Sequence, residues 1–138
     1  MHKIKACVIT CIDFRFQKNI KDYLVKNDYL GEADIISVAG ASHDIATPQT
    51  PVDQNYLMNQ IGISVSLHNP DKIIIVDHQD CGMYAATGKI EKGLDLPKDT
   101  EKHTNYLLKA KELIQQKYNN IEVVLLMAGL DGSFTEIQ

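Results

Sequence analysis

Two short stretches of the sequence carry side chains of the kinds that bind metals. His78-Gln79-Asp80-Cys81 follows the apolar run Ile73 to Val76, and Cys11-Ile12-Asp13-Phe14-Arg15 follows the apolar run Ile4 to Thr10. Imidazole and thiolate are preferred ligands of zinc. A single His-x-x-Cys pair is weak evidence, because such pairs arise by chance. Together, however, the two stretches offer the thiols of Cys11 and Cys81, the imidazole of His78, the carboxylate of Asp13 and the guanidinium of Arg15, which packing alone does not explain.

The spacing within the first stretch suggests how its side chains are presented. If the backbone stays extended beyond Thr10, alternation places Cys11, Asp13 and Arg15 on the same side of the chain. A second interpretation makes Cys81 a thiol nucleophile with His78 as its base. It gives Cys11 and Arg15 no role, so we rank it below zinc binding.

Composition describes an ordinary globular chain. Its 138 residues form a single predicted domain, 1–138, with 44% hydrophobic and 23% charged residues. The formal charge of −4 and the absence of a basic cluster argue against a nucleic-acid partner. No apolar run approaches the roughly 20 residues of a membrane span, and the N-terminus does not read as a signal peptide. We therefore expect a cytoplasmic protein whose three cysteines are reduced, with Cys7 as a core residue.

Apolar periodicity and turn residues predict strands alternating with helices. Strands are expected at 4–10, 33–39, 72–76 and 121–127, with a short terminal strand after Asp131-Gly132. Long helices are expected from Phe16 to a C-cap at Gly31, from an N-cap at Asp53 to Leu67, and over 101–118 after an N-cap at Thr100. A short helix is expected over 83–87, and loops over 41–51 and 88–98.

This order predicts an α/β domain with three layers, α/β/α, around a mostly parallel sheet. In such sheets, ligands bind at the carboxyl ends of the strands where the winding direction reverses. Both chemically active stretches follow carboxyl ends, of the first and the third strand. If the two stretches share one site, those strands are neighbours and the strand order is 2-1-3-4, with the short terminal strand added.

The two motifs resemble those of the β-class carbonic anhydrases. Cys11, Asp13 and Arg15 match the family's Cys-x-Asp-x-Arg, and His78, Cys81 and Gly82 match its His-x-x-Cys-Gly. Ala39-Gly40 and the ending 129–137 also fit, so the resemblance covers nearly the whole chain. It implies that Cys11, His78 and Cys81 bind zinc, with Asp13 and Arg15 as a catalytic dyad. It further implies that a zinc-bound hydroxide hydrates CO2 reversibly to bicarbonate.

The sequence also departs from the family pattern. Ser37-Val38 stand where Arg-Asn is usual, and Asp77 stands where glycine is usual; we expect the Asp77 side chain to face outward. We expect no counterpart of the family's N-terminal arm, so the long loop and the edge of the sheet would be left uncovered, and we expect a homodimer or larger homo-oligomer to cover them. The alternative is a zinc-binding relative with little CO2 activity, either structural or regulatory, or a hydrolase of a CO2-like molecule such as carbonyl sulfide.

Other candidate motifs carry less weight. The stretch 82–89 imitates a phosphate-binding loop, but it has one residue too many between its glycines, and Ile90 follows it where Ser or Thr is required, so we reject it. His43 is expected to be a solvated loop residue, and His2, His68 and His103 are expected at the surface. Tyr84 either lines the site or packs beneath the turn.

Overall fold

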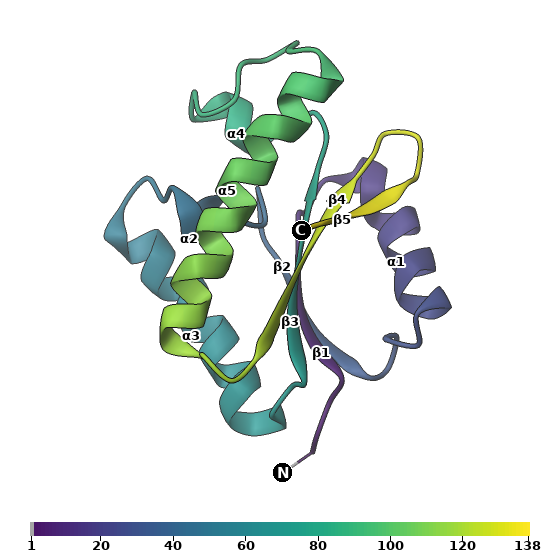
Figure 1. The fold of residues 1–138 in the computed structure, drawn as a ribbon, viewed down its shortest axis with the longest axis vertical. Coiled ribbons are helices and arrows are strands. Elements are labelled where there is room, and N and C mark those ends of the chain that lie inside the picture. Colours follow the sequence, from purple (N-terminus) through teal and green to yellow (C-terminus); the bar gives the residue numbers. More distant parts are fainter. Residues whose placement is uncertain (1) are drawn as a thin grey trace.

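The computed structural model describes residues 2–138, which fold around one five-stranded sheet (Figure 1). The elements in chain order are β1 (Ala6–Thr10), the 3-10 helix η1 (Phe14–Phe16), α1 (Gln17–Lys26), β2 (Ala33–Ser37), α2 (His43–Ala46), α3 (Pro51–His68), β3 (Lys72–His78), α4 (Gly82–Ala86), α5 (Leu96–Lys117), β4 (Glu122–Ala128) and β5 (Phe134–Ile137). The sheet order is β2-β1-β3-β4-β5, with β5 alone antiparallel. The predicted order 2-1-3-4 and the short terminal strand are confirmed.

Helices cover both faces of the sheet, as a three-layer fold requires. Figure 1 shows α2, α3 and α5 on one side and α1 on the other. Within β1 and β3, alternate residues enter opposite cores: Cys7 and Ile73 pack in the larger core with α3 and α5, whereas Val8 and Ile74 pack in the smaller core with α1. This burial on both faces explains why the two central strands are continuous apolar runs.

Several helix boundaries differ from the predicted ones. The capping side chain of α3 is Thr50, and Asp53 is its reciprocal partner in a capping box. Helix α5 begins at Leu96 after an N-cap at Asp95, because Pro97 is well suited to a first helical turn. Helix α1 ends at Lys26, before the expected cap at Gly31. The predicted loop over 41–51 includes the short helix α2.

The chain does not stay extended after β1. Asp13 caps η1 by accepting a hydrogen bond from the Arg15 backbone N–H at 2.9 Å. The premise that alternation aligns Cys11, Asp13 and Arg15 is therefore wrong, and a tight turn brings Asp13 and Arg15 together instead. Within residues 2–138, no helix combines the length and apolarity needed to cross a bilayer.

Candidate metal centre

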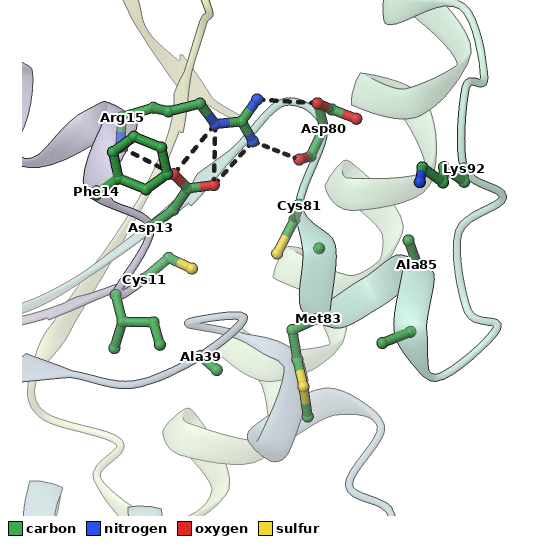
Figure 2. A pocket seen from close by; sticks show the side chains of 13 residues that line it. Cys11, Asp13, Phe14, Arg15, Ala39, Asp80, Cys81, Met83, Ala85 and Lys92 are labelled. Atoms are coloured by element: carbon green, nitrogen blue, oxygen red, sulfur yellow. Dashed lines mark hydrogen bonds and ion pairs between the residues drawn. The ribbon is translucent and has the colours of Figure 1, made fainter.

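The carboxyl ends of β1 and β3 bring the two motifs to one place. The strands are parallel neighbours with Thr10 paired to Val76, so the residues that follow them emerge at the same edge. One ligand atom from each of Cys11, His78 and Cys81 lies within 4.8 Å of the other two, and all three residues are buried. Figure 2 shows Cys11 and Cys81 facing each other from β1 and the start of α4.

The orientation of His78 suits a metal ligand. Its Nδ1 donates a hydrogen bond to the Gln79 carbonyl at 2.7 Å, which leaves Nε2 as the atom that can ligate. This Nε2 is buried and has no hydrogen-bond partner among the described residues. Phe16 stacks on the ring with centroids 4.2 Å apart. Burial opposes protonation of His78, but the neighbouring Cys11 and the Gln79 carbonyl outweigh it and raise its pKa.

The two thiols shift each other's pKa in opposite directions. The hydrogen bond from Cys81 lowers the pKa of Cys11 to about 4, helped by His78 and by the Gly40 N–H, which lies 3.3 Å from Cys11 Sγ. The same hydrogen bond, with burial, raises the pKa of Cys81. An orphaned imidazole nitrogen beside two such sulfur atoms fits zinc, which takes three protein ligands and keeps an open position in catalytic sites.

A charged pair borders the three candidate ligands. Arg15 binds Asp13 in a bidentate manner, with Nε–Oδ1 at 3.1 Å and Nη2–Oδ2 at 2.8 Å. These hydrogen bonds hold the pKa of Asp13 below its usual value, so it is ionised at neutral pH. Its Oδ2 lies 3.8 Å from His78 Nε2. The predicted dyad therefore lies beside the candidate ligands.

Asp80 is a candidate site residue that the sequence analysis missed. Its carboxylate accepts a hydrogen bond from Arg15 Nη1 at 3.0 Å, and its carbonyl accepts one from Nη2 at 2.9 Å (Figure 2). Arg15 is therefore held between Asp13 and Asp80. The signal was available, since Asp80 lies inside the His-x-x-Cys motif immediately before a candidate ligand.

A pocket of about 800 Å³ opens over these groups. The sulfur and carboxylate groups line it together with mostly apolar side chains (Figure 2). These further lining residues are Ile12, Phe14, Ala39, Met83, Ala85, Ala86 and Lys92. Tyr84 does not line the pocket: it packs beneath the turn, fully buried, with its hydroxyl 2.6 Å from Ser42 Oγ.

The expectation that Asp77 faces outward is wrong. Asp77 is 1% exposed and accepts hydrogen bonds from the Ser42 N–H at 3.1 Å, the Ser42 hydroxyl at 2.7 Å and His103 Nδ1 at 2.8 Å. The physical reason is that β3 lies between β1 and β4 with helices on both faces, so neither face meets solvent. His103, expected at the surface, is buried because it lies on the face of α5 that packs against the sheet.

The remaining histidines divide between surface and core. His43 is buried, with Nδ1 2.8 Å from Asp44 and Nε2 2.8 Å from Thr87, because α2 packs its loop inward. The expectation of a solvated His43 is therefore wrong. His2 is exposed as expected, and His68 is partly exposed and hydrogen-bonded to Asp34.

Comparisons with known proteins agree with this geometry. The family model described as "Putative carbonic anhydrase" matches residues 1–138. The chain belongs to this carbonic anhydrase family. An uncharacterized protein of Rickettsia bellii (strain RML369-C) is 30% identical over 141 residues, covering 99% of this chain and 84% of the relative. Because that relative is itself described as uncharacterized, it gives no information about function.

Solved structures of β-carbonic anhydrases have the same fold. The β-carbonic anhydrase CafA of Aspergillus fumigatus superposes with a TM-score of 0.68 at 13% identity, covering 99% of this chain and 76% of that chain. A structure described with the tetrameric β-carbonic anhydrases of Sordaria macrospora gives 0.67 at 10% identity, with coverages of 99% and 82%. The resemblance to the β-class is thus confirmed at the level of fold.

Proposed function

We propose that this chain is a zinc-dependent carbonic anhydrase that hydrates CO2 to bicarbonate reversibly. The observation that carries the proposal is the Asp13–Arg15 pair, held 3.8 Å from His78 Nε2 at the edge of a pocket. A zinc site with a purely structural role has no use for an ionised carboxylate fixed beside its ligands. Structural sites are typically closed by four protein ligands.

Cys11, His78 and Cys81 are the residues that would hold the metal. Zinc bound there would supply a Lewis acid that allows water to ionise near neutral pH. The chain itself prepares the ligands: the Gln79 carbonyl fixes the tautomer of His78, and the Gly40 N–H stabilises negative charge on Cys11.

Asp13 would orient the attacking water. As an ionised carboxylate it can only accept hydrogen bonds, so it would accept one from the O–H of the water. A lone pair of the water oxygen would then point toward the carbon of CO2. Arg15 prevents Asp13 from rotating by binding both of its oxygens. The apolar side chains of Ile12, Phe14 and Met83 give the uncharged substrate a surface it can occupy without competing for the polar groups.

The proposal includes a small-molecule substrate, a homo-oligomeric assembly and a cytoplasmic location. All three cysteines are free, which suits a reducing compartment. A second candidate is a zinc protein with little CO2 turnover, or one that hydrolyses a CO2-like molecule such as carbonyl sulfide. Asp77, which precedes His78 in the chain, favours this second candidate. It is buried in a polar network with Ser42 and His103 at a position where the family usually has glycine.

Metal analysis combined with a CO2 hydration assay tests the proposal. We expect close to one zinc per chain, loss of that zinc in C11S and C81S, and hydration well above the buffer rate. Cys7→Ser is the matched control, since Cys7 lies inside β1 and is not one of the three candidate ligands. Zinc-loaded wild-type protein that is no faster than buffer near pH 9, well above the expected pKa of the reacting water, would favour the second candidate. Carbonyl sulfide hydrolysis would then be assayed on the same sample.

A further inference from the structure

Helix α5 makes three hydrogen bonds with the turn that carries His78 and Cys81. Asp77 Oδ2 accepts a hydrogen bond from His103 Nδ1 at 2.8 Å, and Gln79 Nε2 donates one to Thr100 Oγ1 at 3.3 Å. The backbone N–H of Asp80 donates one to Asp99 Oδ2 at 3.2 Å. Helix α5 therefore contacts both ends of the turn through polar side chains.

The Asp80 contact bears directly on the proposed dyad. Asp80 has a φ of 57°, a left-handed conformation that non-glycine residues rarely adopt. This conformation is the one in which its carbonyl and its carboxylate both bind Arg15. A strained residue persists only where surrounding contacts hold it, and its N–H is held by Asp99.

Asp99 is itself fixed in position. It is 4% exposed, lies in the first turn of α5, and shares a helix face with His103 because the two residues are four apart. Its Oδ1 lies 4.0 Å from His103 Nε2. That Nε2 is buried and has no hydrogen-bond partner within residues 2–138. His103 is bound in turn by Asp77, so the carboxylate of Asp99 is packed between the metal-binding turn and the core of the domain.

We propose that Asp99 is a positioning residue for the reaction. By holding the Asp80 N–H it keeps Asp80 in its left-handed conformation, and Asp80 then keeps Arg15 aligned on Asp13. This role rests on the proposed function, since its consequence is the orientation of Asp13 in the pocket. Asp99 is neither one of the three candidate ligands nor one of the residues that line the pocket.

Three variants separate positioning from simple stability. Asp99→Ala removes the acceptor, whereas Asp99→Asn keeps a carbonyl oxygen able to accept the Asp80 N–H. Asp95→Ala is the matched control, because Asp95 caps the same helix by accepting the Lys98 N–H at 3.0 Å but makes no contact with the turn. Nuclear magnetic resonance follows hydrogen exchange at the Asp80 amide and at Arg15 Nε–H in each protein as purified. The CO2 hydration assay gives kcat and KM.

In D99A we expect exchange at both N–H groups to be faster by about tenfold or more, since a lost hydrogen bond exposes them. We expect kcat to fall by roughly 10- to 100-fold with KM and zinc content unchanged. D99N should be close to wild type in exchange, and D95A should lose stability without changing either N–H. Wild-type exchange rates in a folded D99A, or equal damage in D99N and D99A, would overturn the proposal. The exchange measurements need no CO2 turnover, so they would still test the role of Asp99 if the proposed function alone failed.

Discussion

At the residue scale, the Asp13 carboxylate is held by Arg15 and lies near the imidazole of His78. Arg15 binds both oxygens, and the carboxylate is held 3.8 Å from His78 Nε2. Because each carboxylate oxygen has two lone pairs, Asp13 can accept a further hydrogen bond on the pocket side. The proposed function depends on hydrogen-bond acceptance at this position, which an isosteric amide can test.

Asp13→Asn should keep the metal and lose most of the activity. The amide can donate a hydrogen bond where acceptance is needed, and it carries no charge to pair with Arg15. We expect kcat to fall on the order of 100-fold, about 3 kcal/mol of barrier, with zinc content unchanged. Asp71→Asn is the control, since Asp71 pairs with Lys3 on the surface away from the pocket. Wild-type kcat in D13N would remove Asp13 from the mechanism.

The thiol of Cys11 gives a second test at the residue scale. In metal-free protein its pKa is lowered to about 4 by the hydrogen bond from Cys81, whereas burial raises the pKa of Cys7 to about 11. The thiolate form of Cys11 is thus favoured at all pH values above its folded pKa and is lost only as the pH falls through about 4. We expect ultraviolet thiolate absorbance at about pH 6, where an ordinary thiol is protonated.

This absorbance should disappear in C11S and persist in C7S. Absorbance that appears only as the pH rises through about 8.5 would mean that Cys11 is an ordinary thiol.

At the scale of elements, the loop between β2 and α2 contacts the site at Cys11. Gly40 has a φ of 83°, and its N–H lies 3.3 Å from Cys11 Sγ. A Cβ added at this position would lie 2.7 Å from His43 Cβ and 3.0 Å from Met83 Cγ. The loop therefore approaches α4 at a distance that only glycine permits.

Gly40→Ala should destabilise the protein and weaken metal binding. Gly31→Ala is a matched control, because Gly31 has a φ of 82° but nothing within 4 Å of an added Cβ. We expect about 1–2 kcal/mol of lost unfolding free energy in G31A from the left-handed backbone, and about 1–3 kcal/mol more in G40A from overpacking. Denaturant unfolding measures the loss of unfolding free energy in each variant. Equal losses would show that the loop can move away without cost.

The elements also show how far the sequence could be interpreted. The strand order followed from one hypothesis, that the two motifs share a site, and the central strands were recognisable because burial on both faces makes them apolar throughout. The dyad was predictable as a pair, although the turn that joins Asp13 to Arg15 was not. Asp77 and His103 were misjudged because their partners are distant in the chain: His103 is 26 residues from Asp77, and Ser42 is 35. Local pattern carries no information about such pairs.

At the scale of the whole molecule, helix α3 has two apolar faces. Leu57 and Ile61 are buried toward the sheet. A second set of large apolar side chains, spaced by four and seven residues on the outer face, is exposed: Val52, Tyr56, Ile63 and Leu67. The strand β2 beside α3 is an edge of the sheet. Unpaired edges and apolar patches of this kind are usually covered in native proteins.

We expect a second copy of the chain to cover this surface, because most soluble oligomers are symmetric homo-oligomers in which one patch meets itself. Sedimentation at micromolar concentration should give a mass at or above twice the 15.5 kDa of one chain. Tyr56→Lys, at a side chain that is 63% exposed, should shift the protein toward monomer by placing like charges across the symmetric interface. Leu108→Lys is the control, since Leu108 is an exposed apolar residue on α5, outside the proposed surface. A monomeric wild-type protein with full activity would contradict the assembly and leave the metal centre complete within a single chain.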